Sequence, residues 1–254
     1  MYSSHGGNTT PQGRGQEHVP RLVVGSDGLA QRRNRARRSP GSVAGGQVDV
    51  CFVFDTTGSM VGKIESLIAA MADMVVELDR RGLDWRISVV PFGDLRVPRD
   101  RVDGDHPFTA DVTHAQHLLR SMPRFSGGGN VGESSIEAMQ AALAKPTRPG
   151  AVAALVLLTD DAAHQDRTTP AQLQQHLLDA EVVTFVVSDP LVYYQQWASA
   201  TGGRWFDIRT SPDTDAILQL LHSLCRDVVE VTDAVHALTG GSVARYRALP
   251  PGQR

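Results

Sequence analysis

Residues 48–59 read VDVCFVFDTTGS, an apolar run that passes directly into a polar turn. A nearly continuous apolar run of this length is typical of a central strand whose two faces are both buried. The turn that follows carries oxygen-bearing side chains at alternate positions, Asp55, Thr57 and Ser59. The stretch therefore predicts a buried parallel strand that ends at a polar site.

Outward from this strand, short apolar runs alternate with helical periodicity. Further strands are predicted at 86–92, 153–159, 181–188 and 204–208, and helices at 64–78, around 117–119, from 134 to about 144, at 170–180, 193–200 and 217–231. Strands that alternate with helices are typical of βα units. We therefore predict an α/β fold with a mostly parallel sheet flanked by helices.

The composition changes at residue 48. Residues 1–47 hold seven Arg and two acidic residues, a net charge of +5, and include the run RRNRARR at 32–38. The remaining 207 residues carry 18 basic and 26 acidic side chains, so the total of −3 combines a basic arm with an acidic domain. Because the arm is poor in apolar residues, we expect it to be disordered. The predicted organisation is a disordered basic arm at 1–47, one domain at 48–235 and a C-terminal tail at 236–254.

The cysteine and apolar content limits the compartment. Cys51 and Cys225 lie far apart in the chain, which excludes a disulfide framework and a cysteine-based zinc site and fits a reducing compartment. No window approaches the roughly 18 apolar residues of a membrane span, and the N-terminus lacks the apolar stretch of a signal peptide. We expect a cytoplasmic protein without a membrane partner. Nucleic acid is not favoured, since only the arm would contact it and no aromatic residues interleave its arginines.

Oxygen-rich side chains follow several predicted strands. Asp94 follows the strand at 86–92, and Asp160 and Asp161 follow the strand at 153–159. The loop SGGGNVGES at 126–134 adds Asn130 and Glu133. Because open α/β sheets bind ligands at the carboxyl ends of their strands, we expect these groups at one edge. Hard oxygen donors favour Mg²⁺, with Mn²⁺ or Ca²⁺ as alternatives.

Four separated motifs carry a resemblance to a known family. DTTGSM at 55–60, after an apolar strand, resembles the metal-ion-dependent adhesion site (MIDAS) of a von Willebrand factor type A (VWA) domain. SGGGNVGES, LVLLTDDAAH and ATGGRWFDI resemble the second, third and closing segments of bacterial members. The resemblance covers roughly residues 48–230 and implies the VWA version of the predicted α/β fold, a doubly wound, mostly parallel and Rossmann-like sheet flanked by helices.

The resemblance also implies a set of metal ligands. By position, the family's first-loop ligands fall on Asp55, Thr57 and Ser59, and its third-loop ligand on Asp160. Where many members carry Thr in the second loop, this chain has Gly129, followed by Asn130. Asn130 or Glu133, directly or through water, would then replace the missing hydroxyl.

In this family the ion leaves one coordination position open for an acidic side chain of a partner protein. We therefore expect a non-enzymatic, metal-dependent interaction module whose partner presents an Asp or Glu. Asp94 and Asp161 are candidates for side chains that support the ligands from behind. Gly129 and His164 are candidates for the rim that contacts the partner.

An enzyme is the alternative reading. The same acidic edge would activate a metal-bound water for phosphoester hydrolysis. That reaction needs a base and a substrate pocket, which the sequence does not identify. A nucleotide-binding loop is not favoured, because the glycines at 127–129 lack the Gly-Lys-Ser/Thr ending of a P-loop.

Overall fold

The computed structural model describes residues 46–127, 129, 132–210 and 214–254. The predicted disordered arm at 1–47 lies almost entirely outside these ranges, as does Asn130. Within the described ranges, no helix is long and apolar enough to cross a membrane.

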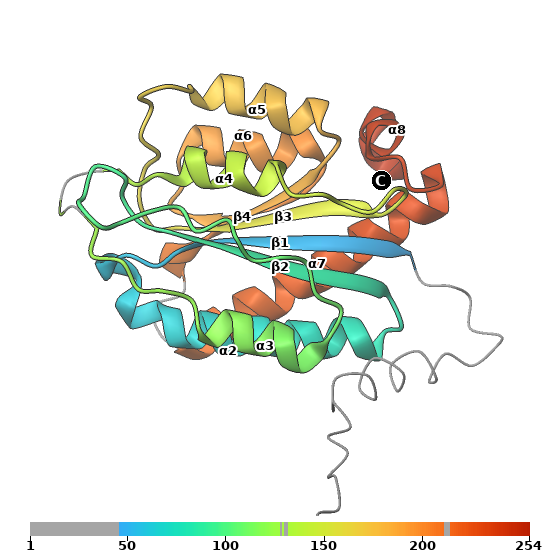
Figure 1. The fold of residues 1–254 in the computed structure, drawn as a ribbon. Coiled ribbons are helices and arrows are strands. Elements are labelled where there is room, and N and C mark those ends of the chain that lie inside the picture. The colour runs from blue at the N-terminus through green and yellow to red at the C-terminus, as the bar shows by residue number, and fades with distance from the viewer. Residues whose placement is uncertain (1–45, 128, 130–131, 211–213) are drawn as a thin grey trace, which may run out of the picture. The chain divides into compact units, whose positions relative to one another are not determined.

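A five-stranded sheet forms the centre of the domain (Figure 1). Its strands are β1 (Gln47–Asp55), β2 (Asp84–Phe92), β3 (Val152–Leu158), β4 (Val183–Ser188) and β5 (Trp205–Asp207). They are ordered β2-β1-β3-β4-β5, and every neighbouring pair is parallel. The predicted parallel sheet is therefore confirmed, with β1 at an interior position where strands on both sides cover it.

Helices cover both faces of the sheet, as a doubly wound fold requires (Figure 1). One face packs against α2 (Val61–Arg80), α3 (Val112–Arg120) and α7 (Thr214–Thr239), and the other against α4 (Ser135–Leu143), α5 (Pro170–Asp179) and α6 (Val192–Thr201). Side chains of β1 alternate between the two cores, because successive residues of a strand point to opposite faces. Phe52 and Phe54 enter the first core, and Cys51 and Val53 the second.

The packed chain ends later than the predicted boundary at residue 235. That boundary lies inside α7, and a further helix, α8 (Val243–Ala248), follows the turn at Gly240 and Gly241. Val243 and Tyr246 of α8 are buried in the same core as α2 and α7. Residues of the predicted tail therefore contribute to the hydrophobic core, because α8 carries apolar residues three positions apart on one face.

The two outer strands of the sheet differ. β2 is bridged along its outer side by antiparallel pairs of Ile87 with Thr109 and of Phe92 with Val102, both from the segment that follows it. At the other margin, β5 has only three residues. The short segments that bridge β2 also bring the loop after this strand close to its carboxyl end.

The amino end of β1 is fixed by a buried ion pair network. Asp49 is 1% exposed, and its two carboxylate oxygens accept hydrogen bonds from Arg86 (3.0 and 2.6 Å) and from the side chain and backbone N–H of Arg148 (2.9 and 2.7 Å). Burial alone would raise the pKa of Asp49, but the hydrogen bonds and charges of the two arginines outweigh it and lower this pKa. Arg148 also pairs with Asp84 at 2.9 Å, which ties β1, β2 and the segment before β3 together.

Candidate functional site

Four side chains at the carboxyl ends of β1 and β3 form a continuous chain of hydrogen bonds. Thr57 Oγ1 donates to Asp55 Oδ1 at 2.6 Å and lies 3.2 Å from Ser59 Oγ. Ser59 Oγ in turn donates to Asp160 Oδ1 at 2.8 Å, across 101 residues of sequence. The structure thus brings together all four predicted first- and third-loop residues.

The local sequence explains this geometry. Asp55 ends β1, and its Oδ1 also accepts the backbone N–H of Thr57 at 3.0 Å, which turns the chain back toward its own strand. The following turn forms the 3₁₀ helix η1 (Gly58–Met60), which leads directly into α2. A tight turn of this kind points alternate side-chain oxygens to one side, and Ser59 therefore reaches Asp160.

Asp55 is the most buried acid of this cluster, with an exposed fraction of 0%. Its Oδ2 accepts a hydrogen bond from Thr159 Oγ1 at 2.8 Å. Burial raises the pKa of Asp55 to about 6, although hydrogen bonds from Thr57 and Thr159 oppose the shift, and the charge of Asp160 adds to it. No arginine or lysine hydrogen bond is recorded for Asp55 within the described part of the chain. The site therefore holds an acid whose negative charge is not balanced by direct contact with a basic side chain.

Lys63 is a site residue that the sequence analysis missed. Its Nζ lies 2.9 Å from Asp160 Oδ2, so both oxygens of Asp160 are engaged. Lys63 stands four residues after Ser59, at the first turn of α2, and is one of only two lysines in the chain. The four-residue spacing from Ser59 could have predicted this contact, because a side chain in the first turn of α2 points back over η1.

Glu133 approaches the cluster from the second loop. A short bridge holds it in place: its N–H donates to Ala162 O at 2.7 Å, and its carbonyl accepts from His164 N at 2.9 Å. A Cβ built on Gly127 would lie 3.1 Å from Thr57 Cβ and 3.2 Å from Glu133 Oε1. Gly127 therefore packs between these two side chains and is close to both. The carboxylate of Glu133 therefore lies beside the first loop.

The carboxylate of Glu133 is buried, and one of its oxygens is unpartnered in the described part of the chain. The residue is 5% exposed, and its Oε2 has no hydrogen-bond partner among the described residues. Burial, together with the charges of Asp55 and Asp94, raises the pKa of Glu133 to about 8. A buried acid oxygen without a donor is costly, and a bound cation or a proton is what would relieve it. Gly129, in the same loop, is exposed, and Asn130 lies outside the described residues.

Asp94 and His164 form a buried pair behind the second loop. His164 Nε2 lies 3.0 Å from Asp94 Oδ1, which also accepts the backbone N–H of Arg96 at 2.9 Å. His164, predicted as a rim residue, is only 6% exposed: the ring faces inward and packs against Gly132, so it offers a partner little surface. The ring leaves no room for a side chain at position 132, because a Cβ on Gly132 would lie 2.5 Å from His164 Nδ1.

Asp161 also supports the second loop. Its Oδ2 accepts the backbone N–H of Gly132 at 3.1 Å, and its Oδ1 accepts that of Ala162 at 2.6 Å. The side chain therefore bonds to backbone groups, and no contact with the four central side chains is recorded for it in the described ranges. Asp161 fits a supporting role in which it holds the loop that carries Glu133.

The donor set fits a hard divalent cation. Asp55 and Asp160 offer carboxylate oxygens, and Thr57 and Ser59 offer hydroxyl oxygens, while the buried carboxylate of Glu133 lies beside the first loop. In the described part of the chain, no three His, Cys, Asp or Glu side chains gather into a metal-binding group. The cluster is built differently, because two of its four central side chains are hydroxyls. Oxygen-only donors of this kind suit Mg²⁺, Mn²⁺ or Ca²⁺ rather than iron or copper.

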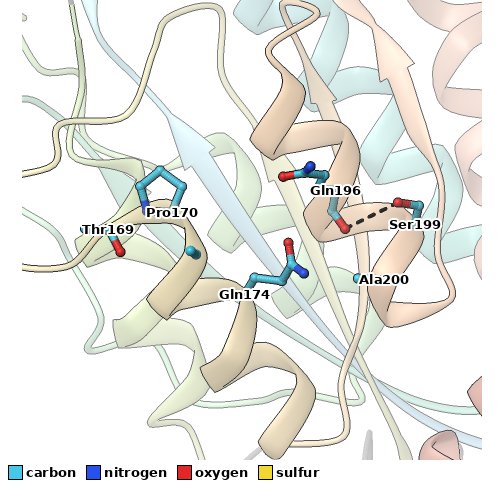
Figure 2. A pocket seen from close by; sticks show the side chains of 7 residues that line it. Thr169, Pro170, Gln174, Gln196, Ser199 and Ala200 are labelled. Carbon is cyan, nitrogen blue, oxygen red and sulfur yellow. Dashed lines mark hydrogen bonds between the residues drawn. The ribbon is translucent and has the colours of Figure 1, made fainter.

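A hollow of about 490 Å³ lies elsewhere, between α5 and α6 (Figure 2). It is lined by Thr169, Pro170, Ala171, Gln174, Gln196, Ser199 and Ala200, and Ser199 Oγ donates to Gln196 O at 3.4 Å. None of these side chains is ionisable. The lining of the hollow therefore contains no acid or base, and the hollow is separate from the cluster at the ends of β1 and β3.

Comparison with known proteins agrees with the geometry. Among protein-family models, that of the von Willebrand factor type A domain matches residues 49–204. A search of the curated proteins finds no match. The matched range begins in β1 and ends just before β5, so it includes the first, second and third loops of the site.

Proposed function

Because the matched range covers more than half of its length, the chain belongs to the von Willebrand factor type A domain family, and we propose that it is a non-enzymatic, metal-dependent protein-binding module. Domains of this family generally serve as interaction modules and commonly bind a divalent metal. The proposal assigns the metal to the carboxyl edge of the sheet and the partner to a protein that presents an Asp or Glu side chain.

The observation that carries the proposal is the hydrogen-bonded chain from Asp55 through Thr57 and Ser59 to Asp160. These four side chains would hold the cation as a MIDAS, and Glu133 would supply the second-loop oxygen that the family's Thr provides elsewhere. When bound, the cation supplies a positive centre that accepts a carboxylate oxygen from the partner. The hydroxyls of Thr57 and Ser59 carry no charge and so leave part of the cation's charge for that carboxylate.

We propose Mg²⁺ as the resident ion, with Mn²⁺ or Ca²⁺ as alternatives. The described residues give the phosphoester hydrolase alternative less support. His164, the imidazole nearest in sequence to Asp160, is buried and engaged with Asp94. The hollow between α5 and α6 carries no ionisable group. The proposed setting is the cytoplasm of a bacterial cell, and the buried, unpaired Cys51 and Cys225 fit a reducing compartment.

Unfolding of the purified protein tests the cation site. Wild type, Ser59→Ala and Asp160→Asn are unfolded with urea in Mg²⁺, Mn²⁺, Ca²⁺ or chelator. An ion at 100 times its Kd should stabilise the wild type by about 2.7 kcal/mol. Both variants should lose this gain. Asp166→Asn is the matched control. Asp166 lies in the loop after β3, is exposed, and pairs with Arg96 of the loop after β2. Equal ion responses in wild type and Asp160→Asn would contradict the site.

The partner is tested by capture from the native host. Wild type and Asp160→Asn are each used as bait, with Mg²⁺ and again with chelator. A protein retained by wild type in Mg²⁺, and lost in both other arms, would then be scanned by replacing its Asp and Glu residues one at a time. Loss of binding at a single acid would support the proposed recognition. Retention of every partner in chelator would refute metal dependence.

A further inference from the structure

Lys63 places a fixed positive charge inside the proposed cation site. Its Nζ contacts Asp160 Oδ2 at 2.9 Å, while Ser59 Oγ holds the other oxygen of the same carboxylate. The two side chains are 31% and 10% exposed, so solvent screens their contact only in part. Asp160 is thus already neutralised by a group of the protein itself.

From this contact we propose that Lys63 is an internal counter-ion that competes with the divalent cation for Asp160 and so sets the ion concentration at which the site fills. The inference rests on the proposed function, because it concerns the same site. It goes further by assigning the affinity of that site to a residue that is not itself a ligand.

The charges around the Lys63–Asp160 pair also support a counter-ion role for Lys63. Asp55 lies close enough to Asp160 for the two negative charges to repel, and Asp189, after β4, interacts with both Asp160 and Lys63. Arg209 is the other basic residue whose charge acts on Asp189, and it is hydrogen-bonded to Asp207. Lys63 is therefore the basic side chain in direct contact with the central cluster, within the described ranges.

Competition follows from electrostatics. A divalent ion that takes Asp160 as a ligand must either displace the ammonium group or bind close to it, and two cations a few ångströms apart repel each other. Removing the ammonium group leaves Asp160 available and eliminates this repulsion. Because the Lys63–Asp160 pair is partly exposed and screened by solvent, its removal is expected to change ion affinity by roughly fivefold.

Isothermal titration with MnCl₂ tests the proposal directly. The proteins are wild type, Lys63→Met, Lys63→Arg and Arg96→Met, each checked by circular dichroism for the native fold. We expect Lys63→Met to bind Mn²⁺ about fivefold more tightly than wild type and Lys63→Arg to bind as wild type does. Arg96→Met is the matched control: it removes one positive charge from the loop after β2, where Arg96 pairs with Asp166, and it should leave Mn²⁺ affinity within about twofold of wild type.

Unfolding provides a second measurement. In chelator, Lys63→Met should melt below wild type, because Asp160 then faces Asp55 without compensation. In saturating Mn²⁺, the rise in melting temperature should be larger for Lys63→Met than for wild type. A purely structural lysine would lower both melting temperatures by the same amount.

The outcomes separate the two proposals. If wild type binds Mn²⁺ and Lys63→Met binds it equally or more weakly, the counter-ion role is wrong and the proposed function stands. If none of the four proteins binds Mn²⁺, Mg²⁺ or Ca²⁺, the proposed function itself fails. Binding by Lys63→Met alone would support the counter-ion role in its strongest form.

Discussion

Two buried aspartates lie near opposite ends of β1, and the charge of their surroundings differs. Asp49, near the amino end, is held by Arg86 and Arg148, and its pKa is lowered. Asp55, at the carboxyl end, is held by the hydroxyls of Thr57 and Thr159, and burial raises its pKa to about 6. The same residue type on the same strand is neutralised by the protein at one end and left with its charge unbalanced at the other.

This contrast separates a structural acid from a functional one. A buried carboxylate that contacts two guanidinium groups has its charge and hydrogen bonds satisfied by the protein, so no ligand is needed to stabilise it. A buried carboxylate among hydroxyls and other acids is costly unless something external neutralises it, and sites of this kind are enriched at functional positions. Removal of Asp49 should therefore cost much more stability than removal of Asp55.

The largest effect is expected from the amino end. Asp49→Ala leaves Arg86 and Arg148 without their shared carboxylate, and loss of one partner of a buried pair costs about 3–5 kcal/mol of unfolding free energy. Because both arginines are partly exposed, we expect a value near 3 kcal/mol, measured by urea unfolding in chelator. Asp55→Asn should cost far less under the same conditions. Equal losses in the two variants would remove the contrast.

The two ends should also give opposite pH dependence. The pKa of Asp49 is lowered from 3.8, so its contribution to stability is present above pH 3.8 and is lost as the pH falls through the folded-state pKa. The pKa of Asp55 is raised from 3.8 to about 6, so stability relative to Asp55→Asn is highest below pH 3.8 and falls by about 3 kcal/mol as the pH rises through 6.

Urea unfolding of wild type, Asp49→Asn and Asp55→Asn from pH 3 to 7, in chelator, measures how the free energy of unfolding of each protein changes with pH. The stability difference between wild type and Asp49→Asn should widen as the pH rises from 3. The difference for Asp55→Asn should change in the opposite direction. Parallel slopes would show that the two acids share one kind of environment.

A smaller effect is expected in the second loop. Gly132 has φ of +111°, and a Cβ there would lie 2.5 Å from His164 Nδ1, so Gly132→Ala should cost about 2 kcal/mol and weaken cation binding. Gly129→Ala is the matched control, since Gly129 also has a positive φ, of +65°, but no atom of the described residues beyond its chain neighbours lies within 4 Å of an added Cβ. It should cost about 1 kcal/mol. Thermal unfolding with and without Mg²⁺ measures both, and a larger loss for Gly129→Ala would contradict the packing of His164.

The smallest effect is expected at the surface. Arg96 and Asp166 pair with side chains that are about half exposed, and exposed pairs contribute about 0–1 kcal/mol. Asp166→Ala should therefore change the unfolding free energy by less than 1 kcal/mol, which gives the scale against which Asp49→Ala is judged. A loss comparable to that of Asp49→Ala would mean that burial does not decide the difference.

The sequence was sufficient to predict the centre of the site. Asp55, Thr57, Ser59 and Asp160 each follow an apolar run, and in a parallel sheet the ends of such runs meet at one edge. Topology, which hydrophobic periodicity predicts, brings the two strand ends together, and the tight turn after Asp55 then directs Ser59 to Asp160. The five strands and the helices on both faces were predictable for the same reason.

Three features were not predictable from that pattern. His164 faces inward because Gly132 leaves space for its ring and Asp94 provides a partner, and neither contact is visible in the sequence around residue 164. Lys63 reaches Asp160 because η1 and α2 follow each other without a break. The packing of α8 depends on where α7 ends relative to the core. Each depends on side-chain placement between elements distant in sequence.

The margins of the sheet have a consequence for behaviour at high concentration. An unpaired strand edge is a template on which a second chain can add its own strand, and this is a common route to aggregation. Along the outer side of β2, a partner strand would meet positions already bridged to Thr109 and Val102. At the other margin, β5 offers only three residues. Both edges are therefore poor templates for strand addition, which protects the protein from edge-to-edge aggregation.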